Sequence, residues 1–173
     1  AASDVYKRQV LDCGCGGGAN IKTLLKLCPN GKVQGIDYSA VSVEKARKVN
    51  ARAIAAGRCT VQQASVAELP FEAEQFDVVT AFETVYFWPE LAQNFREVYR
   101  VLKPGGTFCG CFYVAGECKR TDWFVRHVYE RTGFFTPPYE TVSGLKARLD
   151  GMYTDVDRGN LKSMAWFVCR KAE

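Results

Sequence analysis

Short apolar runs alternate with amphipathic stretches along most of the chain, and this alternation predicts the secondary structure. Five runs are short, rich in Val, Ile, Phe and Cys, and bounded by turn residues, which is typical of strands. They lie at 9–13, 32–37, 59–65, 76–82 and 107–114. The fourth run is apolar at most positions after Asp77, as expected of a strand buried on both faces.

Between these strands, apolar residues recur every three or four positions, which predicts helices at 17–27, 39–56 and 90–102. Ser39 is the expected N-cap of the second helix and Gly57 its C-cap. The third helix is expected to end at the Pro-Gly-Gly turn, residues 104–106. Shorter helices are predicted near 122–131 and at 143–149.

The last part of the chain predicts two strands, 153–157 and 163–170, joined by a short polar connection at 157–160. Elsewhere strands alternate with helices, and parallel strands need such crossovers. The expected fold class is therefore α/β: a doubly wound, mostly parallel sheet of about seven strands that closes with a C-terminal antiparallel hairpin.

The length of 173 residues suits one domain, which we expect at 10–173. Residues 1–9 are expected to be a non-native or disordered leader, with the native N-terminus missing. The segment 116–142 is predicted to be a lid-like insert over a pocket, or a local hydrophobic cluster under a long loop. Its aromatic residues are Trp123, Phe124, Tyr129, Phe134, Phe135 and Tyr139.

Composition narrows the possible functions. There are eight cysteines but one histidine and no C-x-x-C pair, so no metal site is expected. Free thiols in this number suit a reducing compartment, and a cytoplasmic location is expected. No apolar stretch is long enough to span a bilayer, so no membrane partner is expected. The net charge of +4 is scattered along the chain, which disfavours nucleic acid as a partner.

A glycine-rich loop follows the first predicted strand, in the order Asp12-Cys13-Gly14-Cys15-Gly16-Gly17-Gly18. Glycines permit a tight turn and let a ligand approach the backbone, and the next helix N-terminus favours negative charge. The spacing also satisfies the dinucleotide fingerprint, so an NAD(P)-dependent oxidoreductase and a purely structural turn remain alternatives. Asp37 ends the second strand, where an acid accepts hydrogen bonds from ribose hydroxyls or favours the following helix N-terminus.

Five stretches, taken in order, resemble the class I S-adenosylmethionine (SAM)-dependent methyltransferase family. They are Asp12 with the glycines 14–18, GIDYS at 35–39, AELPF at 67–71, FDVV at 76–79 and RVLKPGG at 100–106. The terminal hairpin also matches. The resemblance covers most of the chain and implies a Rossmann-like fold, SAM as the cofactor and methyl transfer to an acceptor.

The resemblance also implies roles for single residues. Asp12 attracts the ammonium group of SAM, loop N–H groups bind its carboxylate, and Asp37 binds the ribose. Tyr38 packs on the adenine, and Ser65 and Val66 lie at its edge, although Ser65 stands where the family often has Asp. The complete cofactor-binding set is expected to be Asp12, Gly14, Gly16, Gly18, Asp37, Tyr38, Ser65, Val66 and Phe82.

The acceptor is expected beyond the fourth and fifth strands, because ligands bind outside the carboxyl ends of parallel strands. Glu83 and Tyr86 are the candidate catalytic residues, and a base is needed only if the acceptor loses a proton. The expected substrate-binding residues are Trp88, Tyr113, Trp123 and Tyr139. We expect a small-molecule methyl acceptor; a non-catalytic or truncated SAM-binding module is the alternative.

Overall fold

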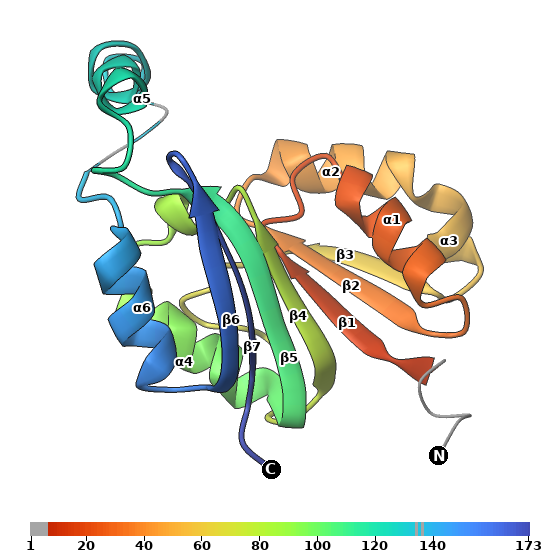
Figure 1. Ribbon diagram of the computed structural model, residues 1–173. Helices are drawn as coiled ribbons and strands as arrows, with labels where there is room; N and C mark the ends of the chain where they lie inside the picture. Colours follow the sequence, from red (N-terminus) through yellow and green to blue (C-terminus); the bar gives the residue numbers. More distant parts are fainter. Residues whose placement is uncertain (1–6, 134, 136) are drawn as a thin grey trace.

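A seven-stranded sheet carries helices on both of its faces (Figure 1). The structure is a computed structural model, and it describes residues 7–133, 135 and 137–173. The strands are β1 Gln9–Cys13, β2 Lys32–Asp37, β3 Cys59–Gln63, β4 Phe76–Phe82, β5 Leu102–Tyr113, β6 Thr154–Leu161 and β7 Met164–Arg170. The helices are α1 Ala19–Leu27, α2 Ala40–Val49, α3 Ala51–Ala55, α4 Leu91–Val101, α5 Lys119–Phe124 and α6 Val142–Asp150, with short helical turns η2 Val85–Phe87 and η3 Val125–Tyr129.

The strand order is β3-β2-β1-β4-β5-β7-β6. Strands β1 to β5 pair in parallel, and β7 pairs antiparallel with both β5 and β6. This arrangement confirms the predicted Rossmann-like sheet with its closing hairpin. The chain order reverses between β1 and β4, and open α/β sheets bind ligands at such a reversal, beyond the carboxyl ends of the strands.

Alternate residues of the central strands belong to two separate cores. In β1, Val10 packs with Ile21 and Val43 in the layer of α1 and α2. Its neighbour Leu11 belongs to the larger core of the opposite face, with Phe95 of α4 and the buried Phe108 of β5. A strand with both faces buried follows from helices on both sides of a parallel sheet.

The second predicted helix is two helices. Ser39 caps α2, since its side chain accepts a hydrogen bond from the Ser42 N–H, as expected. The prediction of a single helix at 39–56 is wrong, because the helix is interrupted at Asn50. The buried Asn50 side chain donates to the carbonyls of Gly18 and Ala46, so it joins the glycine loop to α2.

The predicted hairpin connection is also wrong. Residues 157–160 belong to β6, and the turn lies at Lys162–Ser163, where Lys162 has a φ of 54°. β6 is the edge strand of the sheet, and an edge strand accepts charged and polar side chains that face water. A second boundary moves for a similar reason: α4 ends at Val101, and the 104–106 turn lies within β5, whose pairing begins at Leu102.

The insert forms α5 and η3, which stand away from the body beyond the end of β5 (Figure 1). Phe134 and residues 1–6 of the expected leader lie outside the described residues, and the leader stays a prediction. Arg8 accepts a backbone hydrogen bond from Lys32 beside β1.

All eight cysteines are free. Over the described residues, no helix is long and apolar enough to cross a membrane, and no cluster of His, Cys, Asp or Glu is placed to hold a metal ion.

Replacing Phe108 with Ala tests the larger core. The Phe108 ring is fully buried and contacts the rings of Phe95, Tyr153 and Phe167. We expect Phe108→Ala to lower the free energy of unfolding by about 3–5 kcal/mol, measured by urea denaturation. The exposed Leu27→Ala should change it by less than about 0.5 kcal/mol. Equal effects of the two variants would contradict this packing.

Candidate active site

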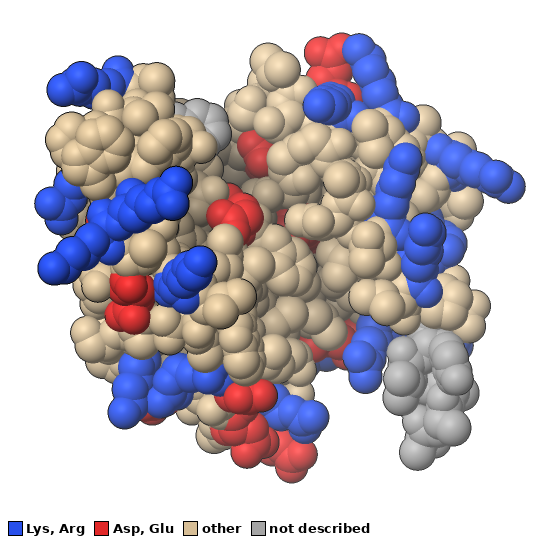
Figure 2. Space-filling view, turned by 45° about the horizontal axis from the view of Figure 1, so that its top comes forward, with Lys and Arg blue, Asp and Glu red and all other residues tan. Residues whose placement is uncertain are grey.

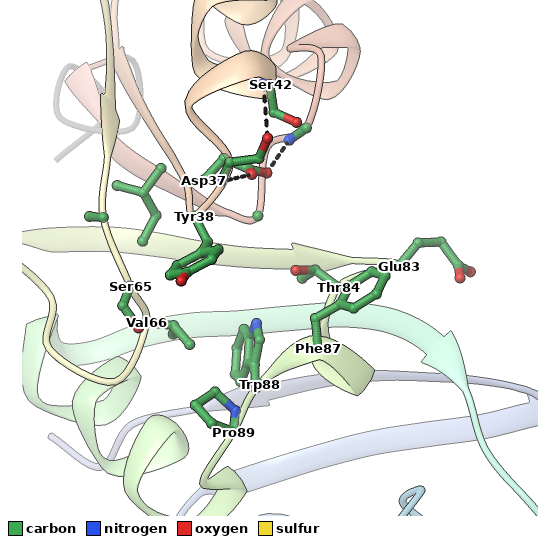
Figure 3. A pocket seen from close by; sticks show the side chains of 15 residues that line it. Asp37, Tyr38, Ser42, Ser65, Val66, Glu83, Thr84, Phe87, Trp88 and Pro89 are labelled. Carbon is green, nitrogen blue, oxygen red and sulfur yellow. Dashed lines mark hydrogen bonds between the residues drawn. The ribbon is translucent and has the colours of Figure 1, made fainter. Parts of the chain in front are cut away.

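A cavity of about 780 Å³ opens beyond the carboxyl ends of β1, β2 and β4 (Figure 3). Its size is ordinary for a site that binds a small molecule. Its lining comes from the glycine loop, the ends of β2 and β3, and the segment that follows β4. The lining residues are Gly14, Gly16, Ile36, Asp37, Tyr38, Ser39, Ser42, Ala64, Ser65, Val66, Glu83, Thr84, Phe87, Trp88 and Pro89.

The glycine loop is fastened to the end of β2 by its own backbone. The N–H groups of Gly14 and Cys15 both donate to the Ile36 carbonyl at 2.9 Å, and the Gly18 N–H donates to Cys15. The Gly16 N–H donates to the Asp37 carboxylate at 2.8 Å. These four amides therefore already have acceptors within the protein, and carboxylate binding by the loop N–H groups stays a prediction.

The N-terminus of α1 is better placed to favour an anion. Gly18 precedes the helix with a φ of 82° and provides no side-chain cap, and the first turn holds no acidic residue. Uncapped first-turn N–H groups and the helix dipole together attract negative charge. Gly18 does not line the cavity; its carbonyl accepts from Asn50, and a Cβ there would lie 2.9 Å from the Ala46 backbone.

Thr84 covers the start of the glycine loop. A Cβ added to Gly14 would lie 2.0 Å from the Thr84 Oγ1 atom, and the φ of Gly14 is 74°. Only glycine suits both that contact and that backbone conformation. Thr84 is buried, lines the cavity, and joins the segment after β4 to the loop after β1.

Asp37 holds the neighbouring backbone with both carboxylate oxygens. One oxygen accepts from the Gly16 N–H and the other from the Ser39 N–H, each at 2.8 Å. Figure 3 shows these bonds at one side of the cavity. Asp37 lines the cavity and also lies just before the N-cap of α2, so its position is compatible with both roles expected from the sequence, and ribose binding stays a prediction.

Asp12 lies in the interior and does not line the cavity. Its Oδ1 atom accepts from the Thr80 hydroxyl at 2.7 Å, while its Oδ2 atom is buried with no hydrogen-bond partner among the described residues. Burial raises the pKa of Asp12 to about 6, with the Thr80 hydrogen bond opposing the change and the charge of Asp37 adding to it. A buried acceptor of this kind favours a cationic or hydrogen-bonding partner.

Tyr38, Ser65 and Val66 face the cavity on the side of β2 and β3 (Figure 3). The Tyr38 side chain is 81% exposed, so it offers a free ring face at the cavity wall. The Ser65 hydroxyl accepts from the Ala67 N–H, which shapes the loop after β3. Phe82 is half-buried at the end of β4 and does not line the cavity.

Glu83 lies at the other side of the cavity, directly after β4. Its φ of 54° is unusual for a residue with a side chain, and its N–H donates to Cys111 at 2.7 Å. Partial burial raises the pKa of the Glu83 carboxyl, and the hydrogen bond from the Tyr86 hydroxyl at 3.2 Å lowers it by less. Strained backbone is common at functional sites.

The remaining candidates for the acceptor side lie in three places. Trp88 lines the cavity and also packs on Phe95, so it serves both the core and the site. Tyr86, Tyr113 and Tyr139 pack in a cluster with Phe135, and none of the three lines the cavity. Trp123 is 58% exposed on α5 and likewise does not line the cavity.

Several lining residues were not among the expected site residues. Three of them lie in the segment after β4, where the predicted site included Glu83 and Trp88 but not their neighbours. The omitted residues are Ile36, Ser39, Ser42, Ala64, Thr84, Phe87 and Pro89. A signal was available for three of them, because Thr84, Phe87 and Pro89 adjoin predicted site residues at the end of a parallel strand.

Comparison with known families decides among the alternatives for this fold. A family model described as a methyltransferase domain matches residues 11–110, more than half of the chain. The chain belongs to this methyltransferase domain family. The matched residues run from β1 into β5 and so include the glycine loop, Asp37 and the segment after β4.

Individual relatives agree with this assignment. Sterol methyltransferase-like 2 of Botryococcus braunii is 34% identical over 116 residues, 67% of this chain and 28% of that protein. Cycloartenol-C-24-methyltransferase 1 of Oryza sativa is 32% identical over 100 residues, 58% of this chain and 29% of that protein. The matches therefore span less than a third of these relatives.

Solved structures share the fold. Phosphoethanolamine N-methyltransferase 2 of Haemonchus contortus, in complex with S-adenosyl-L-methionine, superimposes with a TM-score of 0.81. The identity is 16%, and the match covers 96% of this chain and 49% of that one. The resemblance extends to the whole seven-stranded sheet and its closing hairpin.

The buried carboxyl of Asp12 makes stability depend on pH. The pKa of Asp12 is raised to about 6 from an ordinary value near 4. The protonated Asp12 therefore contributes fully to the free energy of unfolding below about pH 4, and this contribution is lost as pH rises through 6. The difference of about two pKa units corresponds to about 3 kcal/mol. Without ligand, Asp12→Asn should therefore unfold at higher urea concentration than the wild type at pH 7.5, and the two should converge near pH 4.

The matched control is Glu44→Gln, which changes an exposed carboxyl on α2. This variant should keep the pH dependence of the wild type. A wild-type protein that gains stability steadily between pH 4 and pH 7.5 relative to Asp12→Asn would contradict a raised pKa at Asp12.

Proposed function

We propose that this domain transfers a methyl group from SAM to a small-molecule acceptor. One observation carries the proposal: in a chain of the methyltransferase domain family, a single cavity joins the glycine loop and Asp37 to Glu83. SAM supplies a methyl group already activated on a sulfonium, so positioning the acceptor provides much of the rate. Two relatives are named for methyl transfer to cycloartenol and to sterols, which supports a small and largely apolar acceptor.

The residues of the cavity suit SAM in several respects. Asp37 and the exposed Tyr38 ring flank one side, as a ribose and an adenine require. The uncapped α1 N-terminus does not line the cavity, but it follows the glycine loop that does, and it favours a carboxylate. The partnerless Oδ2 of Asp12 attracts an ammonium group through the intervening loop or a bound water, since Asp12 does not line the cavity.

The acceptor is proposed to lie between Glu83 and the aromatic side chains of Phe87 and Trp88. These residues come from one segment, so the end of β4 sets the distance between an apolar surface and a carboxylate. Where the acceptor must lose a proton, Glu83 takes it, since its raised pKa brings the carboxylate closer to neutral basicity. Tyr86 holds the Glu83 carboxylate through its hydroxyl.

Labelled SAM tests the activity itself. The purified chain is incubated with labelled SAM and separate small-metabolite, lipid, protein and nucleic-acid fractions, and label and S-adenosylhomocysteine are measured. We expect label in a small-molecule or lipid fraction. Label entering protein or nucleic acid at turnover rates would contradict a small-molecule acceptor, and binding without turnover would indicate a non-catalytic SAM-binding module.

Calorimetry tests the cofactor assignment. We expect S-adenosylhomocysteine to bind and NAD not to bind. Asp37→Ala should weaken binding about ten- to a hundredfold, because it removes one or more charge-assisted hydrogen bonds. Glu44→Ala, which removes an exposed acid from the neighbouring helix, should leave the affinity unchanged. Tighter binding of NAD than of S-adenosylhomocysteine would support the oxidoreductase alternative instead.

Glu83→Gln tests the acceptor side with the acceptor that the fraction experiment identifies. For an acceptor that loses a proton, we expect kcat to fall about a hundredfold while the affinity for S-adenosylhomocysteine stays within about twofold. Tyr86→Phe removes the hydrogen bond that lowers the pKa of Glu83, so the acid limb of the kcat profile should move to higher pH. Unchanged kcat in Glu83→Gln would exclude Glu83 as the base.

A further inference from the structure

An exposed apolar surface lies on the helical segment that stands away from the body (Figure 1). We call residues 119–131 the projecting segment. Trp123, Phe124 and Val128 are 58%, 46% and 36% exposed there, although they are large apolar side chains. The Trp123 ring stacks on the His127 ring with centroids 4.6 Å apart, so its orientation is fixed before any partner arrives.

The β6–β7 turn adds to this surface. Leu161 is 77% exposed and Met164 39%. The turn lies beside the base of the projecting segment, because the Val114 N–H donates to the Ser163 carbonyl and the Asn160 side chain donates to the Glu117 carboxylate. We call the five exposed side chains the apolar rim: Trp123, Phe124, Val128, Leu161 and Met164.

Basic side chains flank the apolar rim. All are exposed, and none forms an ion pair with another of the described residues: Lys119, Arg120, Arg126, Arg131 and Lys162. Figure 2 shows blue side chains around the tan surface at its upper left, the side of the molecule on which the projecting segment lies. The surface therefore combines free positive charge with exposed apolar groups.

The acidic residues of the same region are engaged with the body of the protein. Asp122 accepts hydrogen bonds from the Tyr113 hydroxyl and the Gly116 N–H. Glu130 accepts one from the Tyr139 hydroxyl. The carboxylates thus hold the projecting segment in place, while its cations stay available to an external partner.

We propose that the apolar rim and its flanking cations dock this domain on the surface of an anionic lipid bilayer. Trp and Phe side chains sit well at the interface between headgroups and acyl chains, and Lys and Arg side chains attract anionic headgroups. The apolar rim lies beyond the end of β5, at the same edge of the sheet as the cavity. Docking requires no methyl transfer and so goes beyond the proposed function.

This proposal modifies the expectation of no membrane partner. That expectation rested on the lack of a bilayer-spanning stretch, a criterion that peripheral docking does not involve. A bilayer fits the surface better than a nucleic acid does. Nucleic-acid bases stack on flat rings, whereas Val128, Leu161 and Met164 offer none, and Trp123 is already stacked on one face by His127.

Vesicle binding tests the proposal with the full 173-residue chain. We expect the protein to sediment with vesicles of phosphatidylcholine and phosphatidylserine, and much less with phosphatidylcholine alone. The double variant Trp123→Ala with Phe124→Ala should bind at least about tenfold more weakly, since two interfacial side chains are lost. Leu27→Ala, which removes a still more exposed apolar side chain from α1, should bind as the wild type does.

A charge variant separates docking on this surface from general attraction to anions. Arg120→Ala with Arg126→Ala should weaken vesicle binding severalfold and reduce its dependence on salt. Lys22→Ala with Lys26→Ala removes two cations from α1 and should change binding much less. Equal losses in the two charge variants, or no binding to phosphatidylserine vesicles, would overturn the proposal. So would binding to a single-stranded oligonucleotide that outcompetes the vesicles for these residues.

Discussion

Backbone hydrogen bonds between the glycine loop and the end of β2 determine the geometry of the cavity. The Ile36 carbonyl accepts from two successive loop amides, and the Asp37 carboxylate accepts from a third. The carboxyl ends of β1 and β2 are thereby held together, and α1 begins at a fixed position beside them. A ligand that enters the cavity would meet a surface that is already formed, which lowers the entropy lost on binding.

The carboxyl groups of Asp12 and Asp37 lie in different environments near this loop. The Asp37 carboxylate accepts backbone hydrogen bonds and faces the cavity, whereas Asp12 is buried and one of its oxygens has no partner within the described part of the chain. An unpaired buried acceptor lowers the stability of the free protein. A cationic ligand near Asp12 would recover that loss, so ligand binding and stability are expected to be coupled at this carboxylate.

The sequence predicted the sheet and its strand types, because those features depend on local patterns. Of the nine residues expected to bind the cofactor, six line the cavity. Each apolar run is a continuous stretch of the chain. The glycine loop and Asp37 each lie at the end of a predicted strand. The wrong predictions concern features that depend on contacts between residues far apart in the chain. The residues 157–160 look like a turn by composition but belong to an edge strand, and Asn50 breaks a helix through a hydrogen bond to the distant Gly18. The contact of Thr84 with Gly14 depends on how two loops meet, so the sequence did not predict it. Trp123 was expected in a pocket since exposure cannot be read from residue type.

The thiol groups separate into two classes. Burial raises the pKa of seven cysteines: Cys13, Cys15, Cys28, Cys59, Cys109, Cys111 and Cys169. Cys118, just before α5, is different, because hydrogen bonding with Thr121 lowers its pKa. Thiolates are the reactive form, so we expect an alkylating dye at neutral pH to modify Cys118 before the other cysteines. The chain thus carries a natural attachment point for a single fluorescent reporter, without removal of the other seven.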